Sequence, residues 1–337
     1  MEIKWGIIGV GDVTEVKSGP AFRKVPYSDL VAVMRRNPEK AKDYADRHGV
    51  RKWYVDAQQL IDDPEVNAIY IATPPDSHLL YAAAALRAGK PVYLEKPMTL
   101  NGAEARELVR LQQAYGGKLV VAHYRREQPY FKKVKELIDS HIGIPRIVNL
   151  RYYQQSLSAE VMQSPRVQWR LNPAQSGGGL FHDLAPHQLD LMYYFFGEIR
   201  FSAGVAHNQA QTYEAVDAVS GQVLFENGVL FNGQWAFNVA EELDVCEVIG
   251  SAGRVSFSVF DNRPVELHDQ HGVQPFAFDP LAHVQQPMIA AVVAYFSGEG
   301  DNPCSVQDGC VVMDVMDRFV SGPTSAASCD GPLGGKP

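Results

Sequence analysis

Two short segments carry side chains that could move protons and stabilise charge. Lys96 lies in a Glu-Lys-Pro sequence that follows an apolar stretch, and the proline keeps Lys96 out of the helical conformation. Residues 177–187 begin with three glycines and contain Asp183 and His187, which are four residues apart. That spacing places both on one face of a helix. Together the segments supply a cation, a carboxylate and an imidazole, so we interpret them as an active site.

A glycine loop after the first apolar segment is typical of nucleotide binding. Gly9 would permit a tight turn, and Gly11 would let backbone amides approach a pyrophosphate. Asp12 and Val13 follow as further expected contacts, whereas Thr14 replaces the third glycine of the usual G-x-G-x-x-G pattern. A glycine pair after a strand is often only a turn. Its place after the first strand of an alternating pattern favours a dinucleotide.

The end of the second apolar segment bears on the choice of cofactor. An acidic residue there would bind the ribose 2'-hydroxyl of NAD, but Arg35 and Arg36 occupy the position and the next acid is Glu39. Arginine pairs with phosphate. The sequence therefore favours NADP, with NAD held through backbone contacts as the alternative.

Other cofactor contacts are expected where later strands end, because open sheets bind ligands at the carboxyl ends of their strands. Thr73 and Pro74 follow the third strand, and Glu95 and Lys96 follow the fourth. His78 lies in the first turn of the next helix and would contact a ribose or phosphate, or be purely structural.

Candidate substrate contacts are Tyr124, Arg125, Trp169 and Arg170. The first two follow the last strand of the alternating region, and the other two precede the glycine triplet. Arg125 and Arg170 would pair with a substrate carboxylate or phosphate, or form ion pairs between domains.

These residues need elements that hold them together, and the first third of the chain alternates between strand and helix patterns. The expected strands are 3–9, 30–34, 68–72, 91–94 and 119–122; the expected helices are 38–48, 77–88 and 101–115, with another helical segment up to about residue 24. Such α/β alternation predicts a doubly wound parallel sheet of Rossmann type, covered by helices on both faces.

The pattern changes after residue 122. Helices are expected at 130–140 and from 177, and strands at 146–153, 216–220, 222–224, 229–237 and 245–249. We predict a nucleotide-binding domain over 1–122, a substrate-binding and oligomerisation domain over 123–324, and a poorly ordered tail over 325–337. One face of the second sheet would need a partner to cover it, which predicts a homo-oligomer.

Composition excludes several classes of function. The net charge is −8, from 31 basic and 39 acidic residues, so nucleic acid is disfavoured as a partner. No apolar run approaches the roughly 20 residues that cross a membrane, and the start lacks a signal peptide. Four cysteines without C-x-x-C spacing favour a reducing compartment, so we expect a cytoplasmic protein. His182 and His187 are five residues apart, which does not fit a helical zinc pair, and no metal is expected.

The glycine loop at 9–14, the Glu-Lys-Pro at 95–97 and the segment 177–187 occur in an order and spacing that resemble the Gfo/Idh/MocA oxidoreductases, such as glucose-fructose oxidoreductase and inositol dehydrogenase. The resemblance implies a Rossmann domain and a C-terminal α/β domain whose large, open, mostly antiparallel sheet forms dimers or tetramers. It also implies NAD(P)-linked chemistry on sugars or polyols. Lys96 would contact nicotinamide and substrate, Asp183 and His187 would face the substrate, and either His187 or Lys96 would be the principal acid/base.

We therefore predict an NADP-dependent oxidoreductase that moves a hydride between nicotinamide and a secondary alcohol or carbonyl of a sugar, polyol or related compound. His187 would take the hydroxyl proton, Lys96 would stabilise the alkoxide, and Asp183 would orient the imidazole or hold a substrate hydroxyl. Two alternatives stay open. One is a glycosidase or epimerase that restores its cofactor in each turnover, and the other is a non-catalytic NADP(H)-binding redox sensor.

Overall fold

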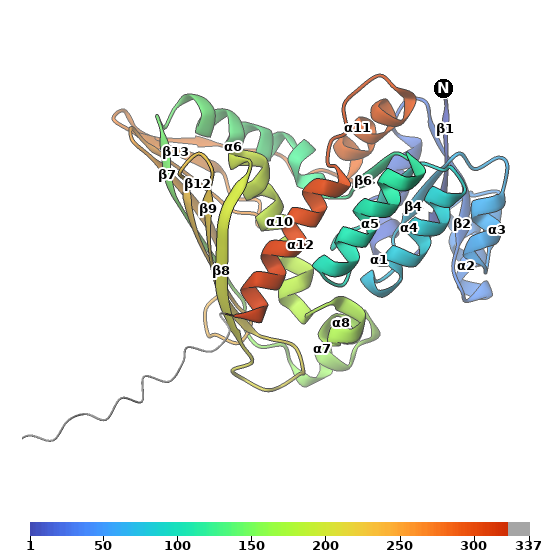
Figure 1. Ribbon diagram of the computed structural model, residues 1–337, viewed down its shortest axis with the longest axis horizontal. Coiled ribbons are helices and arrows are strands. Elements are labelled where there is room, and N and C mark those ends of the chain that lie inside the picture. Colours follow the sequence, from blue (N-terminus) through green and yellow to red (C-terminus); the bar gives the residue numbers. More distant parts are fainter. Residues whose placement is uncertain (323–337) are drawn as a thin grey trace, which may run out of the picture.

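The computed structural model describes residues 1–322 and contains two β-sheets (Figure 1). The first sheet has the order β3-β2-β1-β4-β5-β6, and all neighbouring strands are parallel. This order confirms the Rossmann expectation. The strands are β1 (Ile3–Ile8), β2 (Ser28–Met34), β3 (Lys52–Tyr54), β4 (Ala68–Ile71), β5 (Val92–Leu94) and β6 (Leu119–Val121).

The helices of this half flank the sheet. They are α1 (Asp12–Val16), α2 (Pro38–His48), α3 (Ala57–Asp62), α4 (His78–Arg87) and α5 (Gly102–Tyr115), with 3-10 turns η1 (Gly19–Arg23) and η2 (Pro75–Ser77). The helical segment expected up to about residue 24 is interrupted. α1 ends at Val16 and the chain re-enters a 3-10 turn at Gly19, because Pro20 cannot continue an α-helix.

The second sheet has the order β14-β13-β12-β11-β7-β10-β9-β8 and is antiparallel except between β7 and β10. Its strands are β7 (Pro145–Tyr153), β8 (Ile199–His207), β9 (Ala218–Phe225), β10 (Leu230–Ala236), β11 (Leu243–Gly250), β12 (Arg254–Phe257), β13 (Val265–Asp269) and β14 (Gly272–Phe276). The two strands predicted over 216–224 form the single strand β9. At its centre Gly221 makes room for the Phe319 ring, which would lie 2.2 Å from a Cβ at that position.

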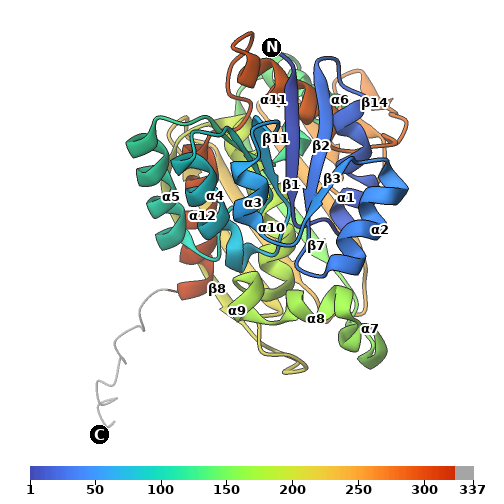
Figure 2. The same ribbon diagram turned by 90° about the vertical axis from the view of Figure 1, so that its right-hand side faces the viewer.

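The remaining helices lie mainly between the two sheets (Figure 1). They are η3 (Tyr124–Glu127), α6 (Pro129–Ser140), α7 (Ala159–Gln163), α8 (Pro165–Leu171), α9 (Pro173–Ser176), α10 (Gly179–Phe196), α11 (Gln286–Ser297) and α12 (Val306–Ser321). α6, α10 and α12 cover one face of the second sheet, and no element of residues 1–322 covers its other face, the open face (Figure 1). Figure 2 shows β1 running towards α8 and α9, so the strands of the first sheet end at this helical layer.

The last two helices return to the first domain. Phe296 of α11 packs on Trp5 of β1 with ring centroids 5.6 Å apart, and Asp317 of α12 accepts a 2.8 Å hydrogen bond from the Gly102 amide of α5. Within residues 1–322 no helix is both long and apolar enough to cross a membrane. The predicted domain boundary stays a prediction, and the predicted tail at 325–337 lies outside the described residues.

Candidate active site

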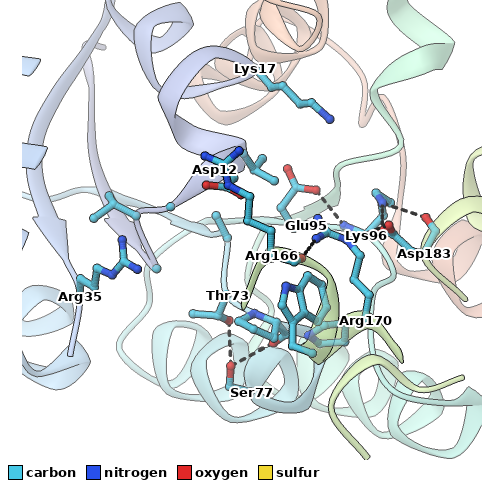
Figure 3. A pocket seen from close by; sticks show the side chains of 18 of the residues that line it. Asp12, Lys17, Arg35, Thr73, Ser77, Glu95, Lys96, Arg166, Arg170 and Asp183 are labelled. Atoms are coloured by element: carbon cyan, nitrogen blue, oxygen red, sulfur yellow. Dashed lines mark hydrogen bonds and ion pairs between the residues drawn. The ribbon is translucent and has the colours of Figure 1, made fainter. Parts of the chain in front are cut away.

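A cleft of about 740 Å³ lies between the strand ends of the first sheet and helices α8 and α10. Figure 3 shows Lys96 and Asp183 meeting on one side of it and Arg35 on the other. The structure brings nearly all the predicted site residues together here. Those that line the cleft are Gly9, Gly11, Asp12, Val13, Arg35, Arg36, Thr73, Pro74, Glu95, Lys96, Tyr124, Arg125, Trp169, Arg170, Asp183 and His187.

The glycine loop has the shape that a bound dinucleotide needs. Gly9 has φ of 95°, and a Cβ there would lie 2.5 Å from Thr73 Cγ2. A Cβ on Gly11 would meet nothing within 4 Å, so the space beside the loop is open. Thr14 is buried; the Gly11 amide donates to its hydroxyl at 2.9 Å, and the hydroxyl donates to the Gly11 carbonyl at 2.8 Å. Thr14 therefore braces the loop where a third glycine is usual.

The cleft is basic where β2 ends. Arg35, Arg36 and Lys40 line it there. Within the described chain neither arginine forms a side-chain ion pair or hydrogen bond. Asn37 caps α2 by accepting the Lys40 amide at 2.9 Å. Such an end of the cleft suits a phosphate group.

Asp183 is the centre of an ion-pair group at the other end. Lys96 Nζ donates to the Asp183 carbonyl and to its Oδ1, both at 2.9 Å, and Arg170 Nε donates to Oδ2 at 3.0 Å. Burial raises the pKa of Asp183, but Lys96 and Arg170 outweigh it and lower that pKa to about 2. The carboxylate is therefore ionised and holds Lys96 in place.

His187 lies beside this group without being bound to it. Its side chain is 5% exposed, and its ring meets Tyr124 and Phe260 edge-on at centroid distances of 5.2 and 5.7 Å. Nδ1 is buried with no hydrogen-bond partner among the described residues. Burial lowers the pKa of His187 well below its usual value, and nearby cations including Lys96 lower it further. Among the described residues Asp183 accepts side-chain hydrogen bonds from Lys96 and Arg170 and none from the His187 ring; the alternative expectation, that Asp183 holds a substrate hydroxyl, stays a prediction.

Glu95 lies behind Lys96 and is nearly buried. Its Oε1 accepts from the Tyr70 hydroxyl at 2.5 Å and from Gln285 Nε2 at 2.6 Å. Sequence reasoning missed Gln285, which lies 190 residues from Glu95 and carries no local signal. Other lining residues that it missed are Lys17, Asn37, Lys40, Ser77, Tyr81, Arg166, Leu184 and Phe260.

His78 does not line the cleft, contrary to the expected cofactor contact. It is fully buried, and its ring nitrogens lie 2.8 Å from the Thr73 carbonyl and 3.0 Å from the Pro97 carbonyl. It thereby ties together the two loops that carry Thr73 and Lys96. The structure therefore fits the other expectation for His78, a purely structural role, because buried carbonyls need hydrogen-bond donors.

Helix α8 forms the wall opposite the glycine loop. Arg170 stacks on Trp169, with its guanidinium carbon 4.5 Å from the ring centroid, and exposed Arg166 pairs with Asp12 at 3.2 Å. The Arg166 pair joins the two domains across the cleft.

One arginine and two histidines near the site have structural roles. Arg126 is buried and pairs with Asp190 at 2.7 Å and Asp308 at 2.6 Å, so it joins elements within the second domain rather than the two domains to each other. His182 is turned away from the cleft, and burial lowers its pKa to about 4. His123 is buried beside Asp190, 3.9 Å away. No group of three or more potential metal ligands is found in residues 1–322.

Two family models match the chain. Residues 3–123 match the oxidoreductase family with an NAD-binding Rossmann fold, and residues 131–256 match the GFO/IDH/MocA C-terminal domain.

Individual proteins resemble nearly the whole chain. Oxidoreductase P35 of Formosa agariphila is 46% identical over 320 residues, which cover 94% of this chain and 98% of that protein. A 1,5-anhydro-D-fructose reductase of Ensifer adhaerens is 28% identical, covering 91% of this chain and 92% of its own. The crystal structure of an aldose-aldose oxidoreductase from Caulobacter crescentus, complexed with glycerol, superposes with a TM-score of 0.82 at 23% identity, covering 95% and 96% of the two chains.

Proposed function

The chain belongs to the GFO/IDH/MocA family of NAD(P)-dependent oxidoreductases, and from this premise we propose that it uses NADP to oxidise or reduce a secondary alcohol or carbonyl group of a sugar, polyol or related small hydroxy compound. The observation that carries the proposal is the placement of Lys96, held by Asp183, beside a neutral His187 at the end of a nucleotide-type cleft.

The residues present fit the dinucleotide. The open space beside Gly11 would take the diphosphate, and Arg35 and Arg36 would pair with the 2'-phosphate. Thr73 and Pro74 would line the path towards Lys96. The bound nicotinamide accepts or supplies the hydride.

His187 would exchange the proton of the substrate hydroxyl. A base in alcohol oxidation must be neutral before it acts, and the lowered pKa of His187 keeps it so at neutral pH. Its ring is positioned by Tyr124 and Phe260 rather than by a carboxylate.

Lys96 would stabilise the developing alkoxide. Two of the three N–H groups of its ammonium are used by Asp183, which leaves one for a substrate oxygen. A donor that is already oriented needs no rearrangement during the reaction, and such groups contribute strongly to catalysis.

The test is turnover followed at 340 nm, with NAD(H) and NADP(H), on a panel of sugars, polyols and hydroxy acids. His187→Asn should lower kcat by about 100-fold or more, the usual contribution of general acid–base catalysis, while NADPH still binds. Arg36→Ala should raise KM for NADPH by about 10-fold and leave KM for NADH within about twofold.

Unchanged kcat in His187→Asn would refute the proton-transfer role. Product formation without a net absorbance change would favour the self-restoring glycosidase or epimerase, and NADPH binding without turnover on the whole panel would favour the redox sensor.

We also propose a homo-dimer or tetramer formed through the open face of the second sheet, in the cytoplasm. Large apolar side chains are exposed on that face, among them Phe201, Val205 and Leu230. Cys246, Cys304 and Cys310 are free thiols, which suits a reducing compartment.

A further inference from the structure

Arg125 is a cation of the cleft without a counter-charge. Its guanidinium carbon lies 4.8 Å from the Phe260 ring centroid, 5.6 Å from that of Tyr124 and 5.7 Å from that of Phe131. Its Nε is buried and has no hydrogen-bond partner. Within residues 1–322 the side chain forms no ion pair. Three aromatic rings thus hold the guanidinium in place while its hydrogen-bond donors remain unused.

Three of the other cations nearby have carboxylate partners. Lys96 and Arg170 share Asp183, and Arg126, the next residue along the chain, pairs with Asp190 and Asp308.

Among the carboxylates, Asp244 has the largest effect on the pKa of Arg125, but it already has hydrogen-bond partners. It accepts from the backbone amides of Val259, Phe260 and Asp261. A cation withdrawn from water without a partner is costly, and burial lowers the pKa of Arg125. The fold itself therefore gives no reason for a charge at this position.

The reacting end of the cleft is also positive overall. Lys17 lines it and, in the described part of the chain, makes no ion pair. The two carboxylates that line this end are engaged: Asp183 by its two cations and Glu95 by Tyr70 and Gln285. An excess of positive charge here stands out in a chain whose net charge is −8.

Arg125 and His187 share the same two rings, Tyr124 and Phe260. A substrate that reaches His187 with its hydroxyl group therefore has Arg125 within a few bonds of the reacting carbon. The cofactor phosphates belong to the opposite end, beside Gly11 and Arg36.

We infer that the substrate carries a carboxylate close to the reacting carbon, as a sugar acid or hydroxy acid does, and that Arg125 binds it. The planar guanidinium fork matches the two oxygens of a carboxylate. A single unpaired fork suits a monoanion better than a phosphate dianion. The inference rests on the proposed function and names the substrate class of that site.

The first experiment compares kcat/KM for pairs of compounds that differ only in the acid group, such as an aldonate with its alditol and a uronate with its aldose. The wild-type protein should prefer the acid of a pair. Arg125→Met should lower kcat/KM for the acid by about 100-fold and change that for the neutral compound by less than about threefold. Arg125→Lys keeps the charge but not the planar fork. Its kcat/KM for the acid should lie between the values of the wild type and of Arg125→Met.

Arg36→Met is the matched control, because Arg36 lies at the other end of the cleft. This variant should change KM for NADPH but not the ratio of kcat/KM for the acid to kcat/KM for the neutral compound. An equal loss on both members of the pair in Arg125→Met would overturn the inference, because it would mean that Arg125 only supports the fold. A wild-type preference for the neutral compound would overturn it too.

A second measurement needs no turnover. With NADPH present, gluconate should raise the Tm of the wild-type protein, glucitol should not, and Arg125→Met should abolish the gluconate effect. If gluconate stabilises the protein but nothing is turned over, the proposed function fails and the carboxylate site stands. If neutral sugars are turned over and no carboxylate stabilises the protein, the site fails and the function stands. Stronger stabilisation by inorganic phosphate than by carboxylates would also overturn it.

Discussion

At the scale of single residues, Asp183 influences both candidates for the principal acid/base, Lys96 and His187. By binding both Lys96 and Arg170 it keeps a positive group fixed beside His187. That positive group and burial lower the pKa of the imidazole. One carboxylate therefore holds the Lys96 ammonium directly and, through Lys96, favours the neutral form of His187.

The pH dependence of alcohol oxidation tests this arrangement. The active form is neutral His187, so kcat/KM should fall as the pH drops through a pKa well below 6.5. Lys17 is one of the cations that lower this pKa. Lys17→Gln should therefore raise it and move the acidic limb of the pH profile to higher pH.

The matched control is Lys24→Gln. Lys24 is outside the cleft, its Nζ lies 2.6 Å from His283 Nε2, and its removal should leave the limb in place. An acidic limb that Lys17→Gln leaves where the wild type has it would mean that another group controls the profile.

At the scale of elements, the start of α10 depends on Gly178. Its φ does not require glycine, but its surroundings leave no room for a side chain. Gly178 has an extended φ of 164°, but a Cβ there would lie 2.0 Å from Nδ1 of the buried His182 ring. Gly178→Ala should therefore displace the first turn of α10, which carries Asp183. We expect the free energy of unfolding to fall by about 2–3 kcal/mol, with a loss of kcat/KM.

Gly197→Ala, at the other end of α10, is the control for that substitution. Gly197 has φ of 77° and ψ of −143° and an open environment, so alanine there should cost about 1–3 kcal/mol of backbone strain and leave activity intact. Urea unfolding and the 340 nm assay measure both quantities. Equal effects of the two substitutions would show that crowding against His182 is unimportant.

The predictable part of the site is the part that follows strand ends. Arg35, Thr73 and Lys96 each lie within two residues of the end of a parallel strand, and such ends meet at one edge of the sheet, so their association follows from the alternating pattern. Phe260 and Gln285 reach the same cleft from loops of the second half. Their positions depend on packing between domains, which no local pattern of the sequence records.

The same reasoning explains the element-level errors. Strand β14 was not expected, because residues 272–276 lie at the sheet edge and are mostly exposed, so their pattern lacks the apolar alternation of a half-buried strand. Strand β13 was also missed, although its residues do alternate, with Val265 and Leu267 buried. His78 was ambiguous because a histidine in a first turn looks the same whether it faces a ligand or a backbone carbonyl.

At the scale of the whole molecule, contacts between the N-terminal and C-terminal parts of the chain hold the two walls of the cleft together. α11 and α12 pack against β1 and α5, and Arg126 joins η3 to α10 and to α12. Lys118 Nζ also donates to the Tyr295 carbonyl at 2.7 Å. The C-terminal helices thus fix the second domain relative to the strand ends that line the cleft.

The open face of the second sheet has no covering layer within residues 1–322 (Figure 1). On β8, Phe201 is 57% exposed and Val205 60%, while Ser202 between them faces α12 and accepts from Arg318. Ile147, Leu230 and Ile249 lie in register on three adjacent strands of the same face. Apolar groups exposed in this way are typical of a subunit interface.

We expect the wild-type protein to elute from gel filtration at the mass of a dimer or tetramer, and Val205→Glu to shift it towards the monomer, because a carboxylate buried in an apolar interface lacks a partner. Leu80→Glu is the matched control: Leu80 is 67% exposed on α4, far from the second sheet, and a charge there should leave the mass unchanged. None of the described residues that line the cleft lies on a strand of the second sheet, so a monomeric Val205→Glu variant should keep the fold and cofactor binding of the wild type. A wild-type protein that runs as a monomer at every working concentration would show that the open face serves another purpose.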